Sequence, residues 1–506
     1  MIRLEQVSWT YPHAESPAVR RLDLHVRPGE CVVLCGASGS GKSTALKLMN
    51  GLIPHFHEDG LLEGTVWVDS ITTREADLDA IGLVTGTVLQ HPRRQFFTDT
   101  AREEVAFAME NFGFPPDRLR SRTGAALADL AGRVPLTGRL RHLSGGQQQQ
   151  VAITAATAHG PRAVLLDEPS SNLSSDAVHR LAAALACLKS QGVAVVVAEH
   201  RLRYLEEVAD RVVVMRDGLL DAEWSAAEFR AVSDEDLARE GLRGRTRDAV
   251  LPALAASGAS VAAPAPPSDA GALEGAGPGA PRAAGAAAPT AATAATAVAG
   301  EAAGGLELEG VRCRLGGRPV LELDRVEFPR GQVTAIRGPN GAGKTTLARI
   351  VAGLQGAAGT VRLDGRPLKA AARRRAAAIV MQDVQRQLFT DSVAAELKLA
   401  AGRPREARHE ALLAALDLDH LAERHPLALS GGQQQRLVVA AVRLAARPVV
   451  VFDEPSSGVD RRHLGSVSDQ VRGLAADGAV VLLISHDEDL LAQAADAQLT
   501  LAPPRP

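Results

Sequence analysis

The sequence of 506 residues contains the same series of short motifs twice, in the same order. The distance between paired motifs falls from 302 residues at the first pair to 286 residues at the last three pairs. The two copies therefore differ by length changes between motifs, as expected for loop variation on a duplicated domain. The pairs are GASGSGKST (36–44) and GPNGAGKTT (338–346), LSGGQQQQ (143–150) and LSGGQQQR (429–436), LLDEPSS (165–171) and VFDEPSS (451–457), and EH (199–200) and SH (485–486).

A segment of unusual composition separates the copies. From residue 251 to residue 304 the chain consists mainly of Ala, Pro, Gly, Ser and Thr, and it contains no aromatic residue. Such a segment cannot bury enough apolar surface to offset the entropy lost on ordering, so we expect it to be disordered. As a coil it would span about 40 Å, enough for the flanking domains to pack face to face. The sequence therefore predicts a first domain at 1–245, a disordered linker at 246–304 and a second domain at 305–502.

Composition narrows the functional class. The chain has 59 acidic and 56 basic side chains, for a formal net charge of -3, whereas a dedicated nucleic-acid binder normally has a basic excess. Its four cysteines are too scattered for a disulfide framework or a zinc site. The first residues lack the apolar core of a secretory signal, and no stretch reaches about 18 consecutive apolar residues. We therefore expect no nucleic-acid partner, and we expect any membrane span to come from another chain.

Each copy alternates short β-rich runs with longer helical stretches. The runs CVVLC (31–35), AVLLD (163–167) and VAVVVAEH (193–200) are almost wholly apolar and end at polar residues. This pattern is typical of strands that are buried on both faces of a parallel sheet and carry functional side chains at their carboxyl ends. In the second copy, VTAIRG, VVVFD and VVLLISH have the same character. TVWVD (65–69) and TVRLD (360–364) alternate more and suit an antiparallel flank.

Both copies carry a glycine-rich loop of the pattern G-x4-G-K-[ST] between an apolar strand and a helical stretch. In a P-loop the glycines let backbone N–H groups converge on phosphate oxygens, and the helix N-terminus adds a favourable dipole. A glycine-rich turn that merely begins a helix is the alternative, and two correctly framed copies argue against it. Lys42 and Lys344 are predicted to reach the β- and γ-phosphates, and Ser43 and Thr345 to place a hydroxyl on Mg²⁺. The predicted nucleotide-binding residues of the two loops are Gly36, Ala37, Ser38, Gly39, Ser40, Gly41, Lys42, Ser43 and Thr44, and Gly338, Pro339, Asn340, Gly341, Ala342, Gly343, Lys344, Thr345 and Thr346.

The runs AVLLD and VVVFD each end in a pair of acids. We expect Asp167 and Asp453 to hold Mg²⁺ through water, and Glu168 and Glu454 to orient or deprotonate the water that attacks the phosphate. A carboxylate pair at a strand end also suits a solvated turn, but the P-loop upstream argues against that interpretation. The sequence thus predicts two sites that hydrolyse a nucleoside triphosphate with Mg²⁺.

The pentapeptide LSGGQ indicates which nucleotide-hydrolysing family this is. Together with the P-loops, the Asp-Glu pairs and the histidines that follow, it makes both copies resemble ATP-binding cassette (ABC) ATPases. The resemblance implies ATP as the nucleotide and an α/β fold with two P-loop domains, each with a mostly parallel sheet, an antiparallel flank and a helical subdomain. It also implies that each LSGGQ motif binds the γ-phosphate held by the opposite domain, through a helix N-terminus. The residues assigned by the resemblance are the signature residues Ser144, Gly145, Gly146, Gln147, Ser430, Gly431, Gly432 and Gln433, the switch histidines His200 and His486, which contact the γ-phosphate, and the glutamines Gln90 and Gln382, which contact Mg²⁺ or the water.

The residues after each glutamine narrow the resemblance further. The chain reads Q-x4-Q-F-F-T-D from Gln90 and Q-x4-Q-L-F-T-D from Gln382, a pattern similar to the ATPases of energy-coupling factor importers for vitamins and metal ions. That resemblance implies two membrane partners, a transmembrane coupling protein and a substrate-binding subunit. It also implies a peripheral position on the cytoplasmic face of a prokaryotic membrane. Fused sugar-importer ATPases and soluble tandem ATPases that act on ribosomes are the alternatives, and the transported substrate cannot be read from this chain.

Acidic residues follow both glutamine loops. Glu103, Glu104 and Glu396 are candidates for pairing with arginines of the coupling protein. They equally suit the first turn of a helix, where the helix dipole stabilises negative charge, and the sequence does not choose between the two. Another pair of polar residues, His55 and His57, lacks supporting metal-ligand spacing, so we expect it to lie on solvated surface.

The two ATP sites are not predicted to be equal. Tyr11 occupies the position at which the family stacks the adenine, and alignment of the copies places Leu315 opposite it. Copy one has Ser174 where the family prefers an aspartate, which copy two keeps as Asp460. By analogy with base stacking on aromatic rings, the missing ring costs about 1–3 kcal/mol. In a head-to-tail pairing of the copies, we therefore expect weaker ATP binding at the second P-loop than at the first.

Overall fold

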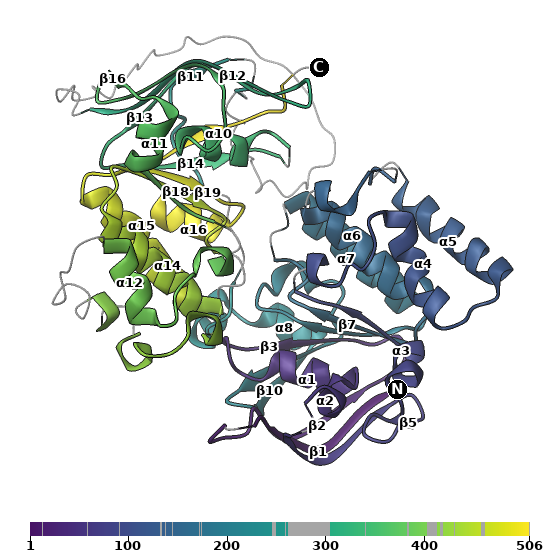
Figure 1. Cartoon of the computed structure of the whole chain (residues 1–506). Coiled ribbons are helices and arrows are strands. Elements are labelled where there is room, and N and C mark those ends of the chain that lie inside the picture. Colours follow the sequence, from purple (N-terminus) through teal and green to yellow (C-terminus); the bar gives the residue numbers. More distant parts are fainter. Residues whose placement is uncertain are drawn as a thin grey trace, which may run out of the picture.

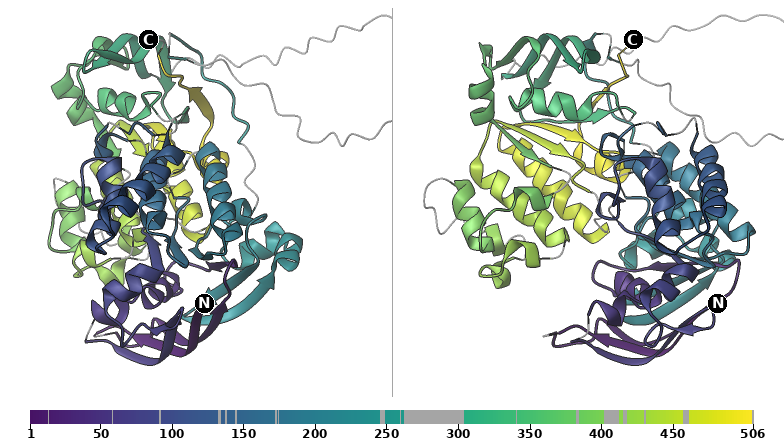
Figure 2. Two further views of the ribbon diagram at one scale, coloured as in Figure 1. Left: turned by 90° about the vertical axis from the view of Figure 1, so that its right-hand side faces the viewer. Right: turned by 45° about the vertical axis from the view of Figure 1, so that its right-hand side comes forward.

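Two domains of similar construction make up the molecule (Figure 1). In each domain an antiparallel sheet, a parallel sheet and a group of helices follow one another, and the antiparallel sheets lie at opposite ends of the molecule (Figure 2). The computed structural model describes residues 1–261 and 304–504 except for residues 13, 58, 91, 132–133, 137, 144, 172, 174, 245–248, 259, 340, 382–383, 402–411, 415–417, 430 and 457–460.

The first domain contains ten strands and nine α-helices among its described residues. Its strands are β1 (Ile2–Thr10), β2 (Val19–Val26), β3 (Cys31–Cys35), β4 (Leu61–Val68), β5 (Ile71–Thr72), β6 (Thr85–Val88), β7 (Ala163–Asp167), β8 (Ala194–Ala198), β9 (Arg211–Arg216) and β10 (Leu219–Ser225). Its helices are α1 (Lys42–Met49), α2 (Leu52–His55), α3 (Leu78–Val84), α4 (Ala101–Asn111), α5 (Pro116–Leu130), α6 (Gly145–Ala158), α7 (Ser175–Ser190), α8 (Ala226–Ala231) and α9 (Asp234–Arg239).

The second domain repeats the plan with fewer helices among its described residues. Its strands are β11 (Ala256–Ser257), β12 (Gly305–Leu315), β13 (Arg318–Pro329), β14 (Val333–Arg337), β15 (Ala358–Leu363), β16 (Arg366–Pro367), β17 (Ala377–Val380), β18 (Val449–Asp453), β19 (Val480–Ile484) and β20 (Ala497–Thr500). Its helices are α10 (Lys344–Val351), α11 (Ala370–Ala376), α12 (Val393–Ala401), α14 (Gly431–Ala445), α15 (Arg461–Ala476) and α16 (Glu488–Ala494).

Strand order explains where a site forms in each domain. In the first domain the order is β10-β9-β3-β8-β7-β6, with β8 parallel to both β3 and β7; in the second it is β17-β18-β19-β14-β20, with β19 parallel to both β14 and β18. The antiparallel sheets have the orders β2-β1-β4-β5 and β11-β13-β12-β15-β16. This confirms the predicted α/β fold with parallel cores and antiparallel flanks. The carboxyl ends of the central parallel strands therefore meet at one edge, beside the loops that precede α1 and α10.

The strand β3 shows why the apolar runs form the core. All five of its residues are buried, because helices or the antiparallel sheet cover both faces of the parallel sheet. Cys31 and Cys35 lie in this strand, and burial raises the pKa of each thiol to about 12. Both cysteines therefore act as small packed side chains of the core.

Residues 249–261 belong to the second domain, so the prediction of a disordered linker from 246 onward is wrong for them. β11 (Ala256–Ser257) pairs with β13 and adds a strand to the antiparallel sheet. Ser260 is fully buried, and its hydroxyl accepts a hydrogen bond from the main-chain N–H of Glu322 at 2.9 Å. The segment is ordered by backbone pairing with exposed sheet edges, which its Ala- and Pro-rich composition does not reveal. Residues 262–303, the rest of the predicted linker, lie outside the described residues.

The domains contact each other through equivalent positions of the two copies. Arg201 Nη2 lies 3.3 Å from Asp487 Oδ2, and the two residues are separated by 286 positions, the offset of the surrounding motifs. Arg94 Nη2 donates a hydrogen bond to Gln385 Oε1 at 2.6 Å, one residue away from the position equivalent to Arg94. A contact between equivalent positions lies on or near a two-fold axis. The two copies are therefore related by a pseudo-two-fold rotation.

Candidate active sites

Close backbone packing shapes each glycine-rich loop. Gly36 and Gly338 have φ values of 142° and 134°. A Cβ atom on Gly36 would lie 2.1 Å from the carbonyl oxygen of Met215, and one on Gly338 would lie 2.2 Å from that of Leu501. Only glycine fits these positions, where the chain turns from a parallel strand into a helix against the neighbouring strand. Both loops therefore have the local structure that the P-loop motif predicts.

In both loops the lysine at the start of the helix bends back over the loop. Lys42 Nζ donates hydrogen bonds to the carbonyl oxygens of Gly36 at 2.8 Å and Ala37 at 2.9 Å, and Lys344 Nζ donates to that of Gly338 at 2.6 Å. Both lysines are buried, and burial lowers the pKa of Lys344. Each loop thus holds an ammonium group at its centre, where an anionic phosphate would be neutralised.

A hydroxyl and a carboxylate meet beside each loop. Ser43 Oγ donates to Asp167 Oδ1 at 3.0 Å, and Thr345 Oγ1 donates to Asp453 Oδ2 at 3.2 Å. Burial raises the pKa of both aspartates, because the charged form loses its hydration. Hydroxyl and carboxylate oxygens are the ligands that Mg²⁺ prefers, and a divalent cation would offset the cost of burying these acids. The donor set therefore fits the predicted magnesium ion.

The glutamate after each aspartate has an unusual backbone conformation. Glu168 and Glu454 have φ values of 43° and 54°, in the left-handed region that residues other than glycine rarely adopt. Their main-chain N–H groups donate to the carbonyl oxygens of Ala198 and Ile484, at 2.8 and 2.9 Å. Gln90 Nε2 donates to Glu168 Oε2 at 2.7 Å. The same strained turn at equivalent positions is typical of a functional site.

Both glutamates have pKa values suited to proton transfer near neutral pH. Burial raises the pKa of Glu168 to about 8, and the nearby carboxylates of Glu199 and Asp167 raise it further. Burial raises the pKa of Glu454 to about 7, with Asp453 adding to the effect. A general base works best when its pKa lies near the working pH.

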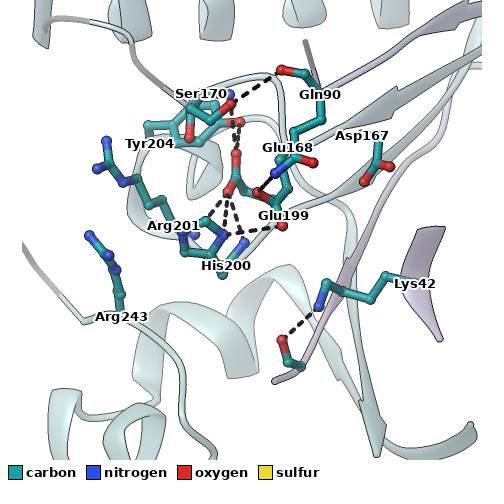
Figure 3. A network of polar contacts seen from close by, with 12 residues as sticks. Lys42, Gln90, Asp167, Glu168, Ser170, Glu199, His200, Arg201, Tyr204 and Arg243 are labelled. Atoms are coloured by element: carbon teal, nitrogen blue, oxygen red, sulfur yellow. Dashed lines mark hydrogen bonds and ion pairs between the residues drawn. The ribbon is translucent and has the colours of Figure 1, made fainter. Parts of the chain in front are cut away.

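His200 of copy one is embedded in a buried network around Glu199 (Figure 3). The Glu199 carboxylate accepts hydrogen bonds from the main-chain N–H groups of His200, Arg201 and Ser170, at 2.8, 3.1 and 3.3 Å, and from Tyr204 Oη at 3.1 Å. His200 Nδ1 lies 3.4 Å from Glu199 Oε1. Burial lowers the pKa of His200 to about 3, so its imidazole is neutral. No sequence motif pointed to Glu199 or Tyr204, and the only signal for them was the replacement of EH by SH between the copies.

Copy two has no carboxylate at the equivalent position. Ser485 Oγ donates to Glu454 Oε2 at 3.4 Å, and the main-chain N–H of His486 donates to the same oxygen at 3.2 Å. His486 approaches Glu454 with Nε2, at 3.8 Å, whereas His200 approaches Glu168 with Nδ1, also at 3.8 Å. Burial lowers the pKa of His486 to about 4. The two histidines therefore lie beside their glutamates, with different ring nitrogens facing them, and their contact with the γ-phosphate stays a prediction.

The region next to the first P-loop contains an aromatic cluster that copy two lacks. Tyr11 Oη lies 3.2 Å from Thr44 Oγ1 in α1. The Tyr11 ring makes edge contacts with Trp9 and His57, at centroid distances of 5.7 and 5.4 Å. His57, expected on solvated surface, instead packs against Tyr11. Leu315 ends β12 in the second copy and is 44% exposed.

A buried glutamate organises the loop after each predicted glutamine. Glu104 Oε2 accepts hydrogen bonds from the main-chain N–H groups of Phe97 and Thr98, at 3.1 and 3.0 Å, and from the Thr98 hydroxyl at 2.8 Å. Glu396 makes the three equivalent hydrogen bonds in copy two, at 3.0, 3.0 and 2.7 Å. Both glutamates are 5% exposed. Of the alternatives that the sequence left open, these hydrogen bonds favour a role of both carboxylates within their own loops over pairing with arginines of a partner.

The same two loops expose aromatic side chains. Phe97 and Phe389 are 74% and 76% exposed, and they occupy equivalent positions in the Q-x4-Q-x-F pattern. Phe97 stacks on Phe107 at a centroid distance of 5.0 Å. Glu103 forms a capping box with Thr100 at the start of α4, which favours the helix-terminus alternative for this residue. The loops thus present exposed aromatic rings, while the carboxylates of Glu104 and Glu396 turn inward.

Some predicted site residues cannot be placed. α6 and α14 begin at Gly145 and Gly431, so each LSGGQ motif stands at a helix N-terminus as expected. The contact of each P-loop with the opposite LSGGQ motif stays a prediction. The predicted residues outside the described part of the chain are Ser144, Ser430, Asn340, Gln382, Ser174 and Asp460.

Two kinds of feature are absent from the described residues. No described helix is long and apolar enough to cross a membrane. No group of three or more His, Cys, Asp or Glu side chains within the described ranges is placed to hold a metal ion.

Comparison with known families agrees with this geometry. The family model described as ABC transporter matches residues 19–171 and 322–457, which include both P-loops, both LSGGQ motifs and both Asp-Glu pairs. The chain therefore belongs to the ATP-binding proteins of ABC transporters and carries two of their ATPase domains in tandem. ATPases of this family bind and hydrolyse ATP and pair with transmembrane subunits.

Individual relatives share this tandem organisation. A Treponema denticola protein provisionally named an ABC transporter ATP-binding protein is 35% identical, and the match covers 97% of this chain and 93% of that protein. A Bacillus subtilis protein provisionally named HMP/thiamine import ATP-binding protein YkoD is 29% identical over 99% of this chain and 90% of its own length. An archaeal ABCE1 in a ribosome-bound complex with Pelota superposes with a TM-score of 0.63 over 98% of this chain and 78% of that one. At 22% identity this last likeness shows the fold alone.

Proposed function

We propose that this chain is the ATPase of an importer of the energy-coupling factor type, peripheral on the cytoplasmic face of a prokaryotic membrane. The observation that carries the proposal is the pair of exposed rings Phe97 and Phe389. Each ring projects from a loop that a buried glutamate holds in place. Two exposed aromatic anchors related by a pseudo-two-fold axis suit a membrane protein that places one short helix beside each loop. The name of the relative YkoD, with its thiamine import, supports the same class.

In this proposal the residues of each site divide the work of ATP hydrolysis. Lys42 neutralises the β- and γ-phosphates, and Ser43 and Asp167 hold Mg²⁺, which when bound stabilises the charge that develops on the phosphates. Glu168 accepts a proton from the attacking water or orients it, and His200 contacts the γ-phosphate. The equivalent residues of copy two have the same roles. The imported substrate is a vitamin, a vitamin precursor or a metal ion, which a separate membrane subunit selects.

Affinity purification from solubilised membranes tests the proposal. We expect the chain to retain a small polytopic membrane protein, and the double variant Phe97→Ala/Phe389→Ala to retain about tenfold less of it, because both aromatic anchors are removed. Leu219→Ala, which truncates a 45% exposed side chain on β10, is the matched control and should retain the partner in full. Recovery of the chain with ribosomes instead of membranes, or normal partner recovery by the double variant, would refute the proposal.

A further inference from the structure

The contact between the domains contains a buried cluster of charges at the pseudo-two-fold axis. Asp487 of copy two is 3% exposed, and its Oδ2 atom receives Arg201 at 3.3 Å and also an ion pair from Arg243 Nη1. Arg243 is likewise 3% exposed. The two arginines lie side by side in the first domain, where residues 201 and 243 form a backbone bridge. One carboxylate from copy two therefore faces two guanidinium groups from copy one.

The pseudo-two-fold axis relates equivalent positions of the two copies, but at this cluster the equivalent residues carry opposite charges. Arg201 follows His200, and Asp487 follows His486, so the position after each switch histidine meets its own equivalent in the other copy. If two first domains paired about the same axis, Arg201 would meet a second Arg201 with two further arginines nearby. If two second domains paired, Asp487 would meet a second Asp487 with neither arginine present. Buried like charges are strongly unfavourable, so only the mixed pair is compensated.

The connection between the two domains begins next to this cluster. Arg243 is the last residue of the cluster in the first domain, and six residues later the chain already contacts the second domain. There the main-chain N–H of Ala249 donates a hydrogen bond to Glu488 Oε2 at 2.8 Å. Glu488 is the residue next to Asp487. The two copies are thus joined within six residues of the charge cluster, and the short connection keeps their effective concentration high.

We propose that Arg201, Arg243 and Asp487 form a recognition surface that pairs the first domain with the second domain and rejects pairing of either domain with its own kind. The partner for which this surface is built is the other half of the same chain. The interface then serves as a fixed pivot beside both switch histidines, and the chain acts as a monomer with two unlike halves. This inference does not depend on what the importer carries.

Crosslinking of the full-length protein tests this inference. Arg94 and Gln385 form an exposed hydrogen bond across the interface, so cysteines at these two positions report pairing when the exposed Cys187 is replaced by serine. We expect Asp487→Arg to lower the rate of crosslinking within the chain by about tenfold or more, because three cations then face one another. The exchange Arg201→Asp/Asp487→Arg should restore the rate to within about twofold of the starting protein, since the introduced carboxylate would again lie between two guanidinium groups.

Two further variants separate charge from general damage. Asp487→Ser keeps a side-chain oxygen that can accept the hydrogen bond of Leu490 N–H at the start of α16, so it removes the charge with less harm to the helix. It should still slow crosslinking. Asp69→Arg breaks an exposed ion pair with Arg162 inside the first domain and should change nothing at the interface. Wild-type crosslinking rates in both Asp487→Arg and Asp487→Ser, or failure of the exchange to restore the rate, would overturn the proposal.

Discussion

The two catalytic centres share an inner arrangement and differ in what surrounds it. In both, a hydroxyl meets an aspartate and a glutamate follows with a left-handed backbone. In copy one, the buried carboxylate of Glu199 underlies His200, whereas copy two has Ser485. Copy one also has Tyr11 where copy two has Leu315. The two copies have kept the groups that we propose bind phosphate and metal, while the residues around those groups have diverged.

The residues around the two sites also give Glu168 and Glu454 different pKa values. The pKa of Glu168 is raised to about 8, partly by the charge of Glu199, and that of Glu454 to about 7. In copy two, Ser485 offers Glu454 a hydroxyl donor in place of a second negative charge. A neutral donor cannot raise the pKa of a neighbouring carboxyl as an anion does. The two sites are therefore expected to respond differently to the same substitution.

Removing each catalytic glutamate is the strongest test of the comparison. We expect Glu168→Gln to lower ATP turnover at the first site about a hundredfold, since loss of a general base has effects of this order, so that total turnover falls to the share of the second site. Glu454→Gln should cost less of the total, because we expect the site at the second P-loop to bind ATP more weakly and to contribute less. Steady-state ATPase rates of the two variants measure this. Equal loss in both variants would show that the two sites are functionally alike.

The aromatic cluster beside the first P-loop gives the next largest effect. Tyr11→Leu gives the first site the residue that the second site has at this position. It should weaken ATP binding at the first site by about tenfold, because one stacking contact is lost. Leu315→Tyr should strengthen binding at the second site by a smaller factor, because that copy lacks the ring contacts that hold Tyr11.

Tyr11→Phe is the control for this pair of variants. It keeps the ring and loses only the hydroxyl near Thr44, so its ATP affinity should stay close to that of the wild type. Titration with ATP in the Glu168→Gln/Glu454→Gln background separates binding from turnover. Unchanged affinity in Tyr11→Leu would show that the ring does not contact the base.

The inner arrangement of the sites could be predicted from the sequence because each part lies in one short motif. The glycine spacing fixed the turn at Gly36, and the apolar run AVLLD placed Asp167 at the end of a parallel strand. Strand ends of a parallel sheet meet at one edge, so Ser43 and Asp167 could be expected to meet although 124 residues separate them. The α/β fold followed from the same patterns.

The parts that could not be predicted depend on the direction of a side chain or on long-range pairing. Glu104 suited both an outward ion pair and a helix terminus, and only the structure shows that its carboxylate turns inward to Phe97 and Thr98. Glu199 has no motif of its own, because its role depends on a turn that brings the donors at 200–204 back to its carboxylate and on Ser170, which comes from a separate segment. Residues 249–261 were assigned to the linker because their composition was judged together with that of the longer Ala-rich stretch that follows. The strand that orders them, β13, lies more than 60 residues further along the chain from β11.

The Glu199 network predicts a moderate effect that is confined to copy one. Glu199→Gln turns an acceptor of four hydrogen bonds into a group that also donates, so the His200 loop should lose its fixed position. In the Glu454→Gln background we expect kcat to fall about threefold to tenfold with little change in KM, since the effect is on orientation and not on binding.

Tyr204→Phe is the matched variant for Glu199→Gln, because it removes one donor and leaves the carboxylate in place. It should have the smaller effect on kcat. A rise in KM at constant kcat in Glu199→Gln would contradict the positioning role. Ser485→Glu is the reverse exchange, and it should raise the pH at which the second site becomes active.

The smallest effect should be on the stability of the protein without nucleotide or Mg²⁺. A glutamate whose pKa is raised on folding stabilises the protein fully only below its unfolded pKa, and this contribution is lost as the pH rises through the folded value. The window for Glu168 therefore ends near pH 8 and that for Glu454 near pH 7. The lowered pKa values of His200 and His486 act in the opposite sense, because the folded protein loses stability as the pH falls below the unfolded pKa of histidine. Both histidines are present in the wild type and in the glutamine variants, so their effect cancels in the comparison. At pH 8 Glu168→Gln should raise the melting temperature of its domain by about 2–4 °C, more than Glu454→Gln does for the other domain. At pH 5, close to the unfolded pKa of glutamate, both substitutions should have a much smaller effect. Equal shifts at both pH values would show that the raised pKa values do not affect stability.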